Sequence, residues 1–133
     1  MEDVTVRIEA EVNPTESEQK VKQAIENIFG AVQYTVQQTR NVNVLTAHAG
    51  GPEALTKLYN LLRRERIRDA ARKVLFEALD RKALSFCLNK QVAYAGHVSF
   101  SMEEAESPLG PLRVIVECDN PRKLIEWLAP RTS

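Results

Sequence analysis

Cysteine, histidine and glycine are scarce in this chain, and each scarcity narrows what the protein can be. Cys87 and Cys118 are the two cysteines and form no Cys-x-x-Cys pair, so we expect small buried thiols rather than a disulfide framework. His48 and His97 are the two histidines and lack the spacing of a metal-binding pair. The five glycines form no Gly-x-Gly-x-x-Gly run and no Walker-type loop. We therefore expect no metal and no cofactor.

Long apolar runs and a net charge are also absent. No stretch approaches the ~20 apolar residues that a membrane span needs. Residues 1–4 are acidic and lack the basic and apolar regions of a signal peptide, so we expect a cytoplasmic protein without a membrane partner. The chain carries 18 Lys and Arg against 18 Asp and Glu. A neutral chain argues against nucleic-acid binding over the whole surface, so any such binding must come from a patch.

The charge is uneven, and residues 61–73 hold six cations and two carboxylates. Arg64, Arg68 and Arg72 recur at every fourth residue, so within one helix they line one side. Arginine suits phosphate because its planar guanidinium makes paired hydrogen bonds. The competing interpretation is a solvated helix face on which Glu65 and neighbouring acids pair with these arginines.

Hydrophobic periodicity predicts the secondary structure. Alternating apolar and polar residues predict strands over 4–12, 32–36, 42–47, 84–88, 98–100 and 112–116. Asn13 and Pro14 are typical of a helix start, and Gly30 is typical of the position after a helix end. Asn120 and Pro121 predict a short last helix in the same way.

Residues 53–79 read as helical but carry two apolar stripes. Leu58 and Leu62 belong to the first stripe, whereas Ala70 and Val74 belong to the second. At ~100° per residue the stripes differ in direction by roughly 90° or more. Because each stripe must face a core, the helix is predicted to break near residues 63–66, which places the basic cluster at a helix–helix junction.

The remaining segments are predicted as connections. Residues 90–96 favour a hairpin loop, and residues 107–111 favour a turn after the acidic loop 103–106. Together the elements predict a single α+β domain over residues 1–133. We expect one mixed, mostly antiparallel sheet with helices packed on one face.

Three segments resemble an uncharacterised family of small archaeal proteins, and their order and spacing match over most of the chain. They are LLRRERIRDAAR at 61–72, LNKQVAYAGHVSF at 88–100 and ESPLGPL at 106–112. The resemblance implies a fold similar to that of the large-subunit ribosomal protein that contacts 5S rRNA. It also implies a distant relationship to an exosome-associated RNA-binding subunit, and a homodimer. No RNA-contact residue is carried over, because fold alone does not fix function.

Aromatic and polar residues outside the basic cluster add further candidates. Phe76 projects away from the second stripe, where it can stack on an unpaired base or be buried against a second subunit or a second core. Lys90, Tyr94 and His97 fall in one loop, which is either a polar binding rim or ordinary loop polarity. The candidate RNA-binding residues are Arg63, Arg64, Arg66, Arg68, Arg72, Lys73, Phe76, Lys90 and Tyr94.

Three functional interpretations follow. The first is a small RNA-binding protein that uses the basic junction, and the second is a homodimeric interaction module without a nucleic-acid partner. Phe76 and Ile115 favour the homodimer, because both are apolar residues outside the main stripes. The third is an enzyme with a site around Tyr94 and His97. No nucleophile and base are recognisable together apart from Cys87 with His97, so we expect no enzyme.

Overall fold

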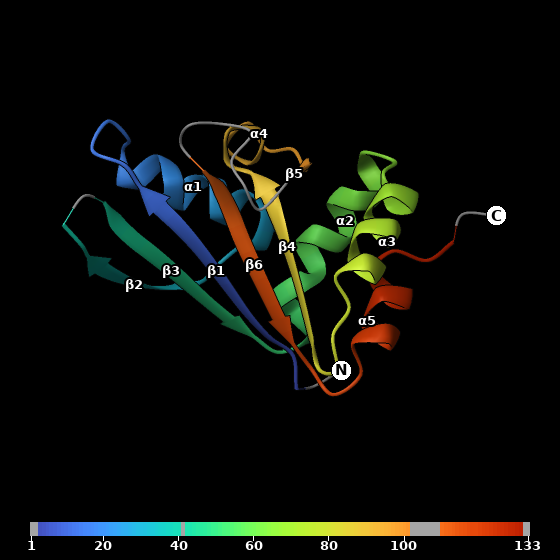
Figure 1. Ribbon diagram of the computed structural model, residues 1–133. Helices are drawn as coiled ribbons and strands as arrows, with labels where there is room; N and C mark the ends of the chain where they lie inside the picture. Colours follow the sequence, from blue (N-terminus) through green and yellow to red (C-terminus); the bar gives the residue numbers. More distant parts are fainter. Residues whose placement is uncertain (1–2, 41, 102–109, 132–133) are drawn as a thin grey trace.

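The protein is described by a computed structural model that covers residues 3–40, 42–101 and 110–131. The described strands form one sheet of six strands in the order β2-β3-β1-β6-β4-β5, and the helices cover one of its faces (Figure 1). Every pairing between these strands is antiparallel, so the predicted α+β class is confirmed. In chain order the elements are β1 (Thr5–Val12), α1 (Glu18–Phe29), β2 (Gln33–Gln38), β3 (Asn43–Gly50), the 3-10 helix η1 (Pro52–Leu55), α2 (Thr56–Arg64), α3 (Arg68–Glu77), β4 (Ala83–Asn89), α4 (Lys90–Tyr94), β5 (Phe100–Ser101), β6 (Pro111–Glu117) and α5 (Pro121–Leu128).

Alternation along β1 explains why the helices lie on a single face. Val6, Ile8 and Ala10 are buried, whereas Thr5 before Val6 and Arg7 after it are exposed. β1 pairs with β3 on one side and β6 on the other, and both neighbours repeat the alternation. One sheet face is therefore apolar, and the helices must cover it to remove it from water.

The predicted start of the first helix at Asn13 is wrong. Helix α1 begins after Ser17, whose hydroxyl accepts a hydrogen bond from the Lys20 amide. Asn13 and Glu16 instead close a tight turn, in which the Glu16 carboxylate accepts from both the backbone and side-chain nitrogens of Asn13 at 3.0 and 2.9 Å. The predicted helix end is confirmed, because Gly30 adopts a φ of 78° that glycine tolerates best.

The predicted hairpin loop at residues 90–96 is also wrong. Asn89 ends β4 and at once caps α4, because its side-chain oxygen accepts from the Val92 amide at 2.9 Å. Gly96, with a φ of 88°, ends the helix in a Schellman turn in which the His97 amide donates to the Val92 carbonyl. Strand β5 is correspondingly reduced to Phe100–Ser101.

Lys90 is buried, so its assignment as an RNA-binding candidate is wrong. Its side chain is 5% exposed, and its ammonium group donates to the Glu11 carbonyl at 2.8 Å and to the Glu16 carboxylate at 3.1 Å. This ion pair joins the first turn of α4 to the end of β1 and to the turn that precedes α1. Both charges lie away from water and depend on each other.

The predicted break near residues 63–66 is confirmed. Helix α2 ends at Arg64 and α3 begins at Arg68. The second stripe was assigned partly wrongly, because α3 buries Ala71 and Leu75 while Ala70 is exposed.

No helix in the described ranges is long and apolar enough to cross a membrane. The acidic loop at 103–106 and most of the turn predicted at 107–111 lie outside the described residues.

Replacing Lys90 with methionine tests the buried ion pair. Lys90→Met leaves the Glu16 carboxylate buried without its cation, so the free energy of unfolding should fall by about 3 kcal/mol. Urea denaturation followed by circular dichroism measures the loss. Lys20→Met, at an exposed position of the adjacent helix α1, is the control and should change stability by less than about 0.5 kcal/mol. Equal effects of the two substitutions would contradict a structural role for Lys90.

Candidate functional site

Arg63 holds the C-terminal helix against α2. Its guanidinium donates to the Leu128 carbonyl at 3.2 Å and the Trp127 carbonyl at 3.3 Å, which are orphan acceptors at the end of α5. The same group lies 3.4 Å from the centroid of the Tyr59 ring, and that ring stacks on Trp127. Arg63 is therefore engaged inside the fold and presents little charge to a ligand.

Arg72 holds the same helix against α3. It makes two hydrogen bonds to the Glu126 carboxylate, at 2.6 and 3.0 Å, and a third to the Ala129 carbonyl at 3.3 Å. Hydrogen bonding to Arg72 lowers the pKa of Glu126, and the charges of Arg131 and Arg122 act in the same direction. The acid that hydrogen-bonds Arg72 is Glu126 of α5, and Asp69 of its own helix adds an electrostatic attraction.

The predicted helix break separates Arg64 from Arg68 and Arg72, so the row that the three would form within one helix is interrupted. Arg64 lies at the end of α2 with its side chain 63% exposed, and donates to the Gly96 carbonyl at 3.0 Å. Arg68 and Arg72 share α3, and Arg72 is turned toward α5. The three arginines therefore do not form one uncompensated line.

The structure joins two clusters that the sequence analysis kept apart, the basic junction and the loop around His97. Glu65 accepts from the Val98 amide at 3.1 Å, and its carboxylate lies 3.2 Å from Nδ1 of His97. Together with the Arg64–Gly96 hydrogen bond, these contacts fix the junction on the end of α4. Tyr94, on α4, is 47% exposed, and its ring centroid lies 5.9 Å from the ammonium group of Lys20 on α1.

Arg66 sits in an unusual backbone conformation at the junction. Its φ is 57°, and among the described residues it is the one non-glycine with positive φ. The Ile67 amide donates to the Leu62 carbonyl and the Arg66 amide to the Arg63 carbonyl, which is a Schellman turn with arginine where glycine is usual. The turn ending α4 has Gly96 at the equivalent place. The backbone at Arg66 is therefore strained, and the turn places an exposed cation at the corner between α2 and α3.

Phe76 is partly buried within its own chain. It packs against the hydrophobic core, and its ring centroid lies 4.8 Å from the guanidinium carbon of Arg72 and 5.6 Å from that of Arg122. Of the two placements predicted for Phe76, the structure favours a second core over a freely exposed aromatic. Its ring lies in the contact between α3 and α5 and is flanked by cations from both helices.

Cations that are free to meet a ligand gather on α3, α5 and the connecting corner. The sequence analysis missed those of α5, because about fifty residues separate the two helices along the chain. No ion pair of these side chains is found within the described part of the chain. We call them the basic helix surface: Arg66, Arg68, Lys73, Arg122, Lys123 and Arg131.

The segments around α3 and α5 carry an excess of cations in the sequence. Residues 61–82 and 119–131, which form the end of α2, α3, α5 and their flanks, hold eleven Lys and Arg and six Asp and Glu. Since the whole chain is neutral, the remainder carries the opposite excess. The sequence signal that could have extended the predicted basic patch is the pair of cations in α5, Arg122 and Lys123.

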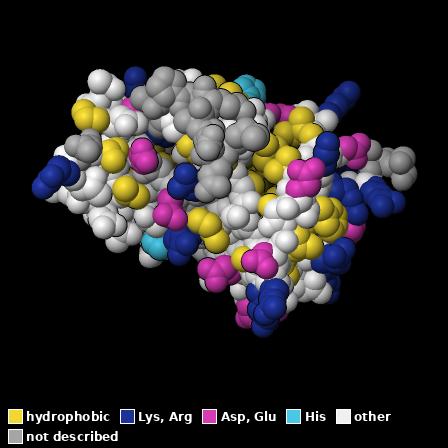
Figure 2. Space-filling view, viewed as in Figure 1, with side chains coloured by type: hydrophobic (Ala, Val, Ile, Leu, Met, Phe, Trp, Pro, Cys, Tyr) yellow, Lys and Arg dark blue, Asp and Glu magenta, His cyan; other side chains and the backbone are white. Residues whose placement is uncertain are grey.

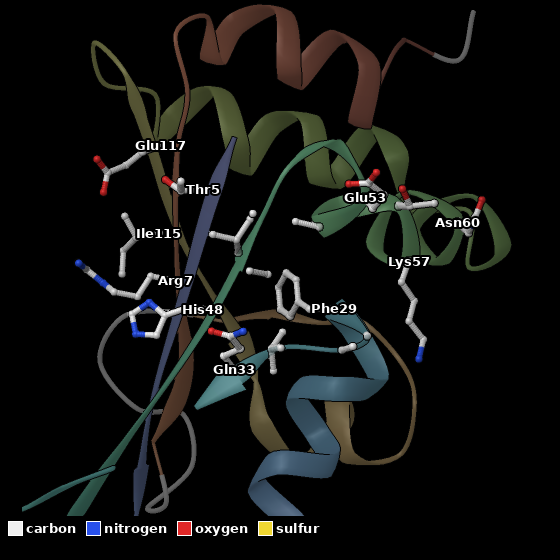
Figure 3. Close-up of a pocket in the computed structure, with 18 residues that line it drawn as sticks. Thr5, Arg7, Phe29, Gln33, His48, Glu53, Lys57, Asn60, Ile115 and Glu117 are labelled. Carbon is white, nitrogen blue, oxygen red and sulfur yellow. The ribbon is translucent and has the colours of Figure 1, made fainter. Parts of the chain in front are cut away.

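A groove of about 1010 Å³ lies away from this surface, where β2 diverges from β3. Gln33 and His48 form the last pair between the two strands, and the chain before Gln33 turns away. In Figure 3, Arg7, Gln33 and His48 lie on one side of Phe29, and Glu53, Lys57 and Asn60 lie on the other. The groove mixes both charge signs around an apolar floor, so its electrostatics favour no particular class of ligand.

Comparisons with known proteins agree with the fold. A protein-family model described as RNA binding matches residues 5–118. A UPF0201 protein of Sulfurisphaera tokodaii is 44% identical over 126 residues, which are 95% of this chain and 87% of that protein. A UPF0201 protein of Sulfolobus acidocaldarius is 40% identical over 128 residues, covering 96% of this chain and 88% of that protein.

Solved structures extend the comparison. The crystal structure of a UPF0201 protein from Methanococcus jannaschii has a TM-score of 0.87 and 37% identity, covering 97% of this chain and 95% of that chain. A DUF54 protein from Methanothermobacter thermautotrophicus has a TM-score of 0.64 at 14% identity, covering 93% and 96%, and shares the fold alone.

The two-layer architecture and the one-sided cations define a class of small α+β proteins that the RNA-binding family model covers. Within that class the chain belongs to the archaeal UPF0201 family. The expected membership of an uncharacterised archaeal family is therefore confirmed. The implied relationships to the ribosomal protein and to the exosome subunit stay predictions.

The strained turn at Arg66 gives a test of the local geometry. Arg66→Gly should raise the free energy of unfolding by about 0.5–1 kcal/mol, because glycine adopts positive φ without steric cost. Arg66→Ala removes the same side chain but keeps the strain, so it should give no such gain. Thermal denaturation of the two variants side by side measures the difference, and equal melting temperatures would refute the strain.

Proposed function

We propose that this protein binds RNA through the basic helix surface. The observation that carries the proposal is the joining of α3 and α5, which adds the cations of α5 to those left exposed on α3. Figure 2 shows Lys and Arg side chains gathered on the side of the molecule where α3 and α5 lie. A neutral protein with its cations on one side can approach a polyanion in one orientation.

Structural arginines support the surface without contacting RNA in this proposal. Arg63 and Arg72 hold α5 in place, so their replacement would disturb the surface as a whole. Arg68, Lys73 and Arg122 would contact phosphates, because each is at least partly exposed and none forms an ion pair within the described ranges. Arg64 and Arg66, both exposed, extend the surface to the corner between α2 and α3.

A preference for unpaired RNA would follow from the aromatic side chains. Phe76 is covered on one side by Arg72, which is fixed by Glu126. Arg122 lies farther from the ring and is exposed, so a base can take its place while the guanidinium moves to a phosphate.

The proposal predicts a charge-specific loss of RNA affinity. The triple variant Arg68→Gln, Lys73→Gln, Arg122→Gln should bind single-stranded RNA about tenfold or more weakly at low salt. The slope of log affinity against log salt should flatten by about one unit per lost contact. Fluorescence titration of a labelled oligonucleotide at several salt concentrations measures both quantities.

A charge-matched control separates this surface from net charge. Arg7→Gln, Lys20→Gln and Arg40→Gln remove the same number of cations from exposed positions on the other side of the chain, and should bind nearly as wild type does. Equal losses in the two triple variants would leave only a nonspecific charge effect. Absence of binding by the wild type at low salt would remove RNA as the partner.

We also propose that the protein is a homodimer. The alternative to RNA binding is a homodimeric protein-interaction module without a nucleic-acid partner. Phe76 no longer supports this, since it packs within its own chain, whereas Ile115 remains partly exposed on the outer sheet face. A second apolar residue, Val36, is 44% exposed on the edge strand β2. Light scattering at micromolar concentration should give twice the chain mass of 15.0 kDa, and a monomer at all concentrations would refute the dimer.

A further inference from the structure

Strand β2 forms one edge of the sheet, on the side away from α3 and α5 (Figure 1). It pairs with β3 over all six of its residues, so its other side presents a complete row of backbone donors and acceptors. The sequence QYTVQQ contains no charged residue, proline or glycine. Natural proteins usually protect such an edge with Lys, Pro, a bulge or a covering segment, and β2 has none of these side chains.

The free edge is also held rigid. The Tyr34 hydroxyl donates to the Glu26 carboxylate at 2.6 Å, which fastens the strand to α1 beneath it. The ammonium group of Lys22 lies 5.0 Å from the centroid of the same ring. An edge fixed in extended form loses little conformational entropy when another strand pairs with it.

Val36 marks where a partner would lie. Val36 and Tyr94 are the large apolar side chains classed as exposed among the described residues, and Val36 is the one on a strand edge. It belongs to the same strand face as Tyr34, but it is not covered as Tyr34 is. A neighbouring strand would cover its side chain and satisfy the open backbone groups together.

We infer that β2 pairs antiparallel with β2 of a second copy of this chain, which joins the two sheets into one. A two-fold axis normal to the sheet requires residues on the same face to lie opposite one another. Centred on Val36, this pairing sets Val36 against the partner's Val36, and Tyr34 against the partner's Gln38. The inference rests on the proposed homodimer and names its surface.

A second copy fits this edge better than an unrelated peptide. At a two-fold axis any charged residue would face its own copy, and β2 carries no charge that could repel itself. The flank formed by α1 carries both signs, with Lys22 and Glu18 paired at 3.4 Å, so two such flanks can meet without excess charge. A mutual strand addition also removes the exposed edge from both chains.

Lysine substitutions test the inference. Val36→Lys places two ammonium groups opposite each other and should raise the dimer dissociation constant about tenfold or more in sedimentation equilibrium. Ser85→Lys is the matched control, because Ser85 is exposed on the outer face of β4 and lies far from this edge in strand order. Circular dichroism checks that both variants are folded.

Cysteine substitutions give an independent measurement. Cys87 and Cys118 are buried and form no disulfide in the described part of the chain, so Val36→Cys supplies an accessible thiol at the proposed axis. Mild oxidation should cross-link Val36→Cys into a covalent dimer and leave Ser85→Cys monomeric on a denaturing gel. A dimer that Val36→Lys does not weaken, or that cross-links through Ser85→Cys instead, would overturn the β2 interface while the homodimer stands. A monomeric wild type would overturn both.

Discussion

Two guanidinium groups determine how the C-terminal helix meets the rest of the fold. Arg63 binds the carbonyls at the end of α5, and Arg72 binds its Glu126 carboxylate and the following Ala129 carbonyl. Both arginines come from the segment with the greatest excess of cations. Part of the most basic segment of the sequence therefore serves internal structure. The cations that remain exposed are joined by those of α5, the helix that Arg63 and Arg72 hold in place.

This arrangement explains why the sequence identified the region but not the residues. Side-chain periodicity determined the strands, because a half-buried strand requires alternation, and the out-of-phase stripes located the break between α2 and α3. Beyond their own helices, Arg63 reaches α5, Arg72 reaches Glu126, and Glu65 reaches His97 and Val98, across 32 to 65 residues of sequence. Local pairing rules concern neighbours three or four residues apart, so they cannot identify these partners.

The misread connection at residues 90–96 has a similar cause. A five-residue helix carries too little periodicity to be recognised, and its cap, Asn89, also belongs to a strand. Lys90 looked accessible because a lysine in a loop usually is. In the fold, Glu16 belongs to the turn that begins at Asn13, and its buried carboxylate binds Lys90. The wrong start of the first helix and the wrong assignment of Lys90 therefore both involve Glu16.

The sheet order has a consequence for how the protein folds. The two central strands, β1 and β6, pair with each other although they are the first and last described strands of the chain. Their pairing raises the contact order, and proteins dominated by such distant contacts fold slowly. During synthesis the centre of the sheet stays open until Glu117 has left the ribosome, since β4 reaches β1 only through β6. The edge of β1 that pairs with β6 therefore remains open for most of translation, and in that interval the chain is most exposed to aggregation.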